Sequence, residues 1–217
     1  MSMFATPAPI AAAFDIPAGR LQVIAADRTD TAVEVRPADA SKGRDVKAAE
    51  RTTVEYADGV LRVHAPSGNR ESGAVEVTVQ LPAGSRIEAR AAGTEFRAVG
   101  RLGDVVFDGA YRHIEIDEAA GVRLTATDGD VEVGRLGGSA DISTLRGDIR
   151  IAEAAGGTVV LGTRSGDISV GAAAGVSASL DAGTSYGRVI NSLKNDGTTG
   201  LDIRATTSRG DIAARSL

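Results

Sequence analysis

The chain has 217 residues, a formal net charge of −5, no cysteine and no tryptophan, and aromatic residues make up only 3% of it. Without cysteine there is no disulfide, thiolate metal site or thiol nucleophile. An acidic chain is also not the kind that neutralises nucleic-acid phosphates, so nucleic acid is not an expected partner. With 27 glycines against 6 prolines, the composition favours many tight turns around small aliphatic side chains over a helical bundle.

Residues 1–84 contain short stretches in which apolar and polar side chains alternate, which is the pattern of half-buried strands. Asp58 and Gly59 separate two such stretches and form a two-residue hairpin signal. The charged segment 41–51 has room for one or two helical turns, and a loop is expected at 67–72. We therefore predict an antiparallel β-sheet segment that caps the rest of the chain. The alternating stretches are 21–25, 33–35, 61–63 and 75–81.

Residues 85–217 repeat a unit of about 18 residues, the signature of a stacked repeat. Each unit carries two short strands with apolar residues two apart and a turn at each end. These features predict an all-β repeat architecture: a flattened β-solenoid with two strands per coil and about seven coils of 17–25 residues. We expect it to pack with segment 1–84 as one continuous domain. The expected inward pairs include Val131 with Val133, Ile149 with Ile151, Thr158 with Val160, and Val176 with Ala178.

One corner of each coil carries a recurring phrase: Thr, one or two residues, then Gly-Asp. The phrase starts at residues 127, 144, 163 and 207, and a variant starts at 184. Glycine adopts positive φ without steric cost, so it is the residue expected at such a corner. The predicted turn residues are therefore Gly129, Gly147, Gly166, Gly187 and Gly210.

Four aspartates follow these glycines, and stacked coils about 4.8 Å apart would bring them into one row. Asp130, Asp148, Asp167 and Asp211 are therefore the candidate metal ligands, because Ca²⁺ takes clustered oxygens. Alternatively, each carboxylate bonds the backbone N–H groups of its own turn. Arg188 occupies the equivalent position between Asp167 and Asp211 and would interrupt a metal array. The calcium-binding nonapeptide of β-helices is absent, so we expect the turn role and no metal.

Two short motifs and two histidines could indicate a functional site, but each has a simpler structural explanation. Residues 183–187 read Gly-Thr-Ser-Tyr-Gly, like an esterase nucleophile elbow, but that site requires a strand–turn–helix and a distant acid and histidine. Arg-Gly-Asp, the cell-attachment tripeptide, occurs at 146–148 and 209–211 on the same corner. His64 and His113 have no partners at metal-binding spacing. We therefore assign no catalytic residue, no cofactor and no enzymatic activity.

The N-terminal sheet segment, the sequence Val-Thr-Val-Gln-Leu-Pro-Ala-Gly-Ser at 77–85, the iterated Gly-Asp units and the closing stretch 180–193 together carry a resemblance. The chain resembles a bacterial β-strand-repeat family, a domain of unknown function labelled "putative adhesin". That label implies a surface location, and the family supplies no catalytic residues to carry over.

These observations favour a non-enzymatic scaffold or protein-interaction module with an unidentified protein partner, because stacked coils present an extended surface. The family label implies a surface adhesin as the alternative. The third and less favoured possibility is a carbohydrate-active β-helix enzyme, which rests on fold analogy alone. It would need a carboxylate pair beside sugar-stacking aromatics, whereas the acidic residues here recur at the corners. The N-terminal residues do not read as a signal peptide, and no stretch approaches the ~18 apolar residues of a membrane span. The expected location is therefore the cytoplasm, or the surface if an unrecognised route exports the protein.

The chain stops soon after Ile212, and no segment after the last coil reads as a cap. An uncovered coil is an open strand edge, which repeat proteins normally protect. We therefore expect a homo-oligomer formed through an uncapped C-terminal coil.

Overall fold

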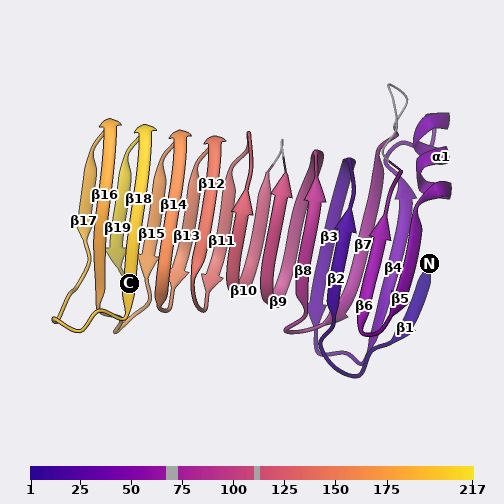
Figure 1. Ribbon diagram of the computed structural model, residues 1–217, viewed down its shortest axis with the longest axis horizontal. Helices are drawn as coiled ribbons and strands as arrows, with labels where there is room; N and C mark the ends of the chain where they lie inside the picture. Colours follow the sequence, from indigo (N-terminus) through magenta and orange to yellow (C-terminus); the bar gives the residue numbers. More distant parts are fainter. Residues whose placement is uncertain (67–72, 110–112) are drawn as a thin grey trace. The chain divides into compact units, whose positions relative to one another are not determined.

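A computed structural model describes residues 1–66, 73–109 and 113–217, and nearly all of its elements are strands (Figure 1). The predicted loop at 67–72 lies outside the described residues. The all-β repeat architecture is confirmed. The chain divides into two compact units, 1–112 and 113–217, while the predicted domains 1–84 and 85–217 remain a prediction. In the described ranges the one helix is nine residues long, and none has the length and apolarity of a membrane span.

The first unit consists of strands and one short helix. The hairpin predicted at Asp58 and Gly59 joins β5 to β6, and both residues have positive φ, 52° and 76°. The elements are β1 (Ser2–Ala5), β2 (Ala11–Asp15), β3 (Ala18–Ala26), β4 (Asp30–Pro37), α1 (Gly43–Arg51), β5 (Thr53–Ala57), β6 (Val60–His64), β7 (Val75–Pro82), β8 (Arg86–Ala91) and β9 (Gly93–Gly109).

The antiparallel cap is only part of this unit. Strand β4 pairs antiparallel with β1 and β7, and β5 with β6. However, β2 pairs in parallel with β6 and β8, and β3 pairs in parallel with β7 and β9. Parallel pairing therefore already includes β2 and β3, and the coil that these two strands form lies between the coils formed by β6–β7 and β8–β9. Strand alternation shows which side chains face inward but not which strand is the neighbour, so the sequence did not reveal this order.

The core of the first unit lies between its two strand layers. Strand β9 pairs with β3 through residues 93–99 and with β8 through 105–109, so it takes part in both layers. Phe96 and Phe107 come from these two parts of β9, and their ring centroids are 5.2 Å apart. Both side chains are buried, as is Phe14, and the other large apolar side chains buried in this core are aliphatic.

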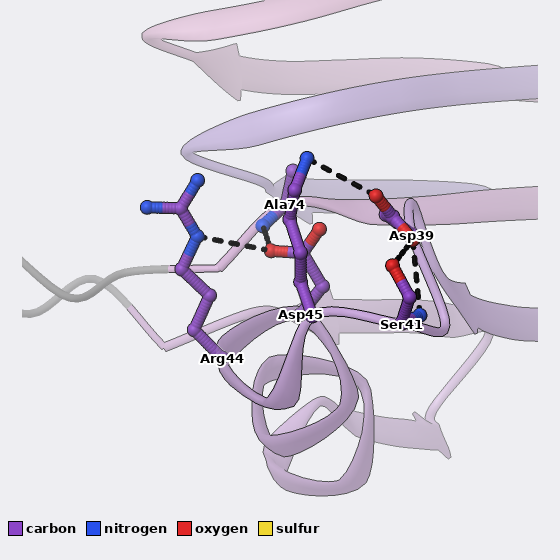
Figure 2. A network of polar contacts seen from close by, with 6 residues as sticks. Asp39, Ser41, Arg44, Asp45 and Ala74 are labelled. Atoms are coloured by element: carbon purple, nitrogen blue, oxygen red, sulfur yellow. Dashed lines mark hydrogen bonds and ion pairs between the residues drawn. The ribbon is translucent and has the colours of Figure 1, made fainter.

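Helix α1, in the segment where a turn or two was expected, is tied to the sheet by a buried carboxylate (Figure 2). Asp45 is 3% exposed, and its Oδ1 accepts the Ala74 N–H at 3.0 Å. Arg44 Nε lies 3.7 Å from the same oxygen. Just before the helix, the hydroxyl and N–H of Ser41 both donate to Asp39, and these bonds lower the pKa of Asp39 to about 2.

The second unit is a stack of strand pairs. Strand β10 takes part in both of its parallel ladders, pairing with β11 through residues 114–119 and with β12 through 122–125. From β12 on, each pair has one strand in each ladder, and the corner phrase or its variant joins the two strands. The elements are β10 (Ile114–Thr125), β11 (Val131–Leu136), β12 (Ala140–Arg146), β13 (Ile149–Ala154), β14 (Gly157–Ser165), β15 (Ile168–Ala172), β16 (Ala178–Tyr186), β17 (Val189–Ser192), β18 (Leu201–Arg209) and β19 (Ile212–Ser216).

The last coil of the chain, residues 201–216, is not at the end of the stack (Figure 1). Strand β18 pairs in parallel with β14 on one side and β16 on the other, and β19 likewise lies between β15 and β17. The prediction of an uncapped C-terminal coil is therefore wrong. Residues 178–192, called here the end coil, lie outermost, because the insertion at 193–200 carries the chain back across one coil.

Most predicted inward positions of the second unit are buried, but two pairs are wrong. Val159 and Leu161 face the core in β14, whereas Val160 is 39% exposed. The register explains the shift, because Ala140 pairs with Val159, one residue further along than an 18-residue period requires. In the end coil, Ala178 is the first buried residue and Val176 lies before the strand. Counting by an 18-residue period therefore predicts the wrong inward residues wherever a corner contains an additional residue.

Candidate functional site

The Thr-Gly-Asp corners stack into a ladder in which each aspartate caps the next coil. The N–H of Asp148 donates to Oδ1 of Asp130 at 2.8 Å, and the N–H of Asp167 donates to Oδ1 of Asp148 at 2.7 Å. The N–H of Asp211 then donates to Oδ1 of Asp167 at 2.7 Å. The carboxylates thus bond the neighbouring coil, not their own turn as expected. Each satisfies a corner N–H group that strand pairing leaves open.

Arg188 ends this ladder instead of interrupting it. Its N–H donates to Asp211 Oδ1 at 2.8 Å, and its guanidinium lies 3.0 Å from Asp211 Oδ2. These two bonds, the backbone one first, lower the pKa of Asp211 below the usual 3.8. The inserted last coil places Asp211 next to Asp167, so the four aspartates are consecutive in the stack.

The corner glycines touch backbone to backbone. Gly129, Gly147, Gly166, Gly187 and Gly210 all have positive φ, between 130° and 159°. A Cβ on Gly166 would lie 2.0 Å from the carbonyl oxygen of Gly147, and one on Gly210 would lie 2.0 Å from that of Gly166. The corner therefore requires glycine for two reasons, its backbone conformation and the absence of a side chain.

The threonine of the phrase completes the corner. The hydroxyl of Thr163 donates to the Gly147 carbonyl at 3.2 Å, that of Thr207 to Gly166 at 3.1 Å, and that of Thr184 to Gly210 at 3.0 Å. The sequence pattern marked these threonines as part of the phrase without revealing that role. The coils of Thr163, Thr184 and Thr207 are thereby bonded to a neighbour through the threonine as well, whereas the hydroxyl of Thr144 bonds the Arg146 carbonyl of its own turn at 3.1 Å.

Backbone N–H groups already engage the carboxylates of the aspartate row. One oxygen of Asp130, Asp148, Asp167 and Asp211 already accepts an N–H group. Within residues 1–66, 73–109 and 113–217, no three acidic or histidine side chains gather as metal ligands do. Arg188 also places a cation on the last carboxylate. The geometry is that of a structural ladder.

The end coil is the part of the second unit that sequence reasoning missed. Among the described strands, β16 pairs only with β18, and β17 only with β19. Tyr186, Val189 and Ile190 are 76%, 45% and 50% exposed. Asn191 occupies the inward position that Ala214 holds in the neighbouring coil. A polar residue at that position was the available signal that this coil is outermost.

A second surface feature lies on the outer face of the first unit. An open depression of about 170 Å³ forms across β6, β2 and β8, where small Ala13 lies among longer charged side chains. Asp15 Oδ2 is 3.2 Å from Nδ1 of His64, and both side chains are about half exposed. The remaining charged residues of its lining are Arg62, Glu88 and Arg90.

The esterase-like pentad has no catalytic context in its own unit. Residues 183–186 belong to strand β16, and Val189 begins strand β17 directly after the corner, so a strand follows where an elbow needs a helix. Both Arg-Gly-Asp tripeptides lie on the corner ladder, with Asp148 and Asp211 engaged in the bonds described above. His113 is exposed beside β10.

A protein-family model described as Toastrack DUF4097 matches residues 16–215. Among curated proteins none matches the chain. Similar solved structures include a "putative cell adhesion protein" of Clostridium sporogenes, at 11% identity, TM-score 0.43 and coverage of 100% of this chain and 98% of the other. Proteins each described as a "putative adhesin" come from Bacteroides fragilis (11%, 0.46) and Parabacteroides distasonis (14%, 0.49), each with 98% of this chain and 95% of the other covered.

Proposed function

The chain belongs to the Toastrack family DUF4097, and from that premise we propose that it is a non-enzymatic β-repeat scaffold that binds a protein partner through its end coil. The observation that supports this is the open edge of β16 and β17. Both strands pair on one side only, among the strands described. Unpaired N–H and C=O groups on a strand edge are a template for another chain.

The side chains of the end coil suit such a contact. Tyr186 combines a large apolar ring with a hydroxyl group, a property that enriches tyrosine in interfaces. Ile190, half exposed, adds apolar surface beside the corner. Arg188 supplies a cation on the same corner, although Asp211 already holds its guanidinium. A partner strand would thus gain backbone bonds along the edge and side-chain contacts at the corner.

The test compares two valine-to-lysine variants. Val189→Lys places a charge on the open edge, which opposes strand addition. Val160→Lys makes the same change on an exposed face of β14, a strand already paired on both sides. Tagged protein is purified from source cells in each form. We expect a partner that is lost with Val189→Lys and retained with Val160→Lys; equal recovery in both would contradict binding through this edge.

The alternative of a surface adhesin follows from the family label and from the names of the similar structures. Protease treatment of intact source cells, with fractionation of the lysate alongside, separates the two. Digestion from outside supports an adhesin. Protection together with recovery in the soluble fraction supports an intracellular scaffold.

A further inference from the structure

The last coil, residues 201–216, fills a slot between coil 157–172 and the end coil. On one wall Leu201, Ile203 and Thr207 pair with Gly157, Val159 and Thr163. On the other wall the same three residues pair with Ala178, Leu180 and Thr184. Every contact that holds the coil in register therefore comes from strands that a second copy of the chain offers identically.

The slot supplies most of what stabilises this coil. Leu201, Ile203 and Ala205 are 0% exposed, and Ile212 is 1% exposed. The corner bonds depend on it as well, because the Asp211 N–H bonds Asp167 and the Gly210 N–H bonds the Tyr186 carbonyl. Burial and hydrogen bonding therefore favour a last coil that occupies a slot. None of these contacts distinguishes the slot of its own chain from the slot of another copy.

The connector at residues 193–200 joins the end coil to the last coil. It is exposed apart from half-buried Leu193. Some of its hydrogen bonds are local, such as Gly197 N–H to Asn195 Oδ1. Others tie it to the adjacent coils, such as Lys194 N–H to Ser216 Oγ and Gly200 N–H to the Ser177 carbonyl, and these would have to be re-formed in the partner. Fully extended it spans roughly 27 Å, about five strand spacings of ~4.8 Å, so it can reach a slot in a neighbouring molecule.

The two walls of the slot also match each other. Because both walls pair with the same residues of β18, Val159 stands in register with Leu180, and through β19 Ile168 stands in register with Val189. The residues of the last coil therefore meet matching positions on both walls of the slot.

We propose that the slot accepts the last coil of a second copy, so that two chains exchange residues 201–216 and form a domain-swapped dimer. Exchange of an identical element preserves all native contacts and costs little beyond association. This proposal is independent of the partner proposed for the end-coil edge, since the dimer leaves that edge in place on each copy.

The absence of native cysteine allows a direct test. Val160 and Arg204 are register partners on β14 and β18, and both are exposed. Parallel neighbours at ~4.8 Å lie within the Cα separation that a disulfide accepts. Val160→Cys and Arg204→Cys chains of different tag length are unfolded together, refolded at high concentration and oxidised. We expect a disulfide-linked heterodimer that exceeds both homodimers.

The matched control is Arg150→Cys mixed with Ser169→Cys. These residues are exposed register partners on β13 and β15, whose coils follow each other in the chain and are not exchanged. A heterodimer no more abundant than in this control overturns the proposal. Light scattering of the full chain with residues 196–198 deleted gives an independent readout, because a shorter connector disfavours return across a coil within one chain. We expect a several-fold higher dimer fraction; a monomer in both experiments also overturns the proposal.

Discussion

The backbone N–H of Asp211 lies 2.7 Å from the carboxylate of Asp167, although the two residues are 44 positions apart. The same bond joins Asp167 to Asp148 across 19 positions and Asp148 to Asp130 across 18. One local arrangement is thus used at both regular and irregular sequence spacing. The arrangement is the same in each case because a corner carboxylate accepts the N–H group of whichever corner lies next to it in the stack. The order of the coils along the chain does not matter for this bond.

Gly166→Ala is expected to destabilise the protein by about 2–4 kcal/mol, since it combines backbone strain with overpacking. The added Cβ would lie 2.0 Å from the Gly147 carbonyl oxygen, and φ is +155°. Gly183→Ala is the control, because a Cβ there meets nothing within 4 Å. Thermal or denaturant unfolding measures both. Equal midpoints would show that the corners do not stack as described.

Thr163→Val should cost about 1–2 kcal/mol, because it removes the hydroxyl that bonds a carbonyl at the half-buried corner. The hydroxyl donates to Gly147 at 3.2 Å. Thr158→Val, on an exposed position of the same strand, is expected to change stability by less than about 0.5 kcal/mol. A loss of equal size in both variants would assign the effect to strand propensity instead.

Ile149→Asp is expected to unfold the second unit cooperatively, because a buried unpaired carboxylate costs several kcal/mol in an apolar core. Ile149 is 1% exposed and pairs with Val131 and Ile168 in the adjacent coils. Arg150→Asp, one residue away on the outer face, serves as the comparison. Circular dichroism melts of the two variants should differ clearly; similar melts would place Ile149 outside the core.

Acid should loosen the end coil before the rest of the ladder. Hydrogen bonds from Arg188 lower the pKa of Asp211 below 3.8 in the folded state. A carboxyl whose pKa is lowered by folding stabilises the fold above its unfolded pKa, and this contribution is lost as pH falls through the lower folded value. Amide exchange of residues 188–192 should therefore accelerate below about pH 4. Asp211→Asn should remove that pH dependence, and an unchanged profile would contradict the assignment.

Calcium and chelators should leave the melting temperature unchanged. An ion that binds only the folded state raises stability by mass action. Oxygens of all four candidate aspartates, however, are already bonded to backbone N–H groups. Melts with millimolar Ca²⁺ and with EDTA are expected to coincide. A shift that disappears in Asp148→Asn would restore the metal site.

The sequence alone determined the strands, the two-strand coil and most inward side chains, since a period of two identifies the buried face of each strand. Val131, Ile149 and Ile168 are buried where the alternation predicts. The glycines at the recurring phrase were likewise evident, because a sharp corner with positive φ selects glycine.

Only the tertiary structure decided the order of the coils. Each coil presents nearly the same edge, so alternation cannot say which coil lies next to which, and the chain places its last coil inside its own stack. That order made Arg188 the end of the aspartate row and left Val189 exposed. The polar Asn191 at an inward position and the long insertion before residue 201 were the local signs. Their meaning depended on contacts between distant segments, which a repeated pattern does not distinguish.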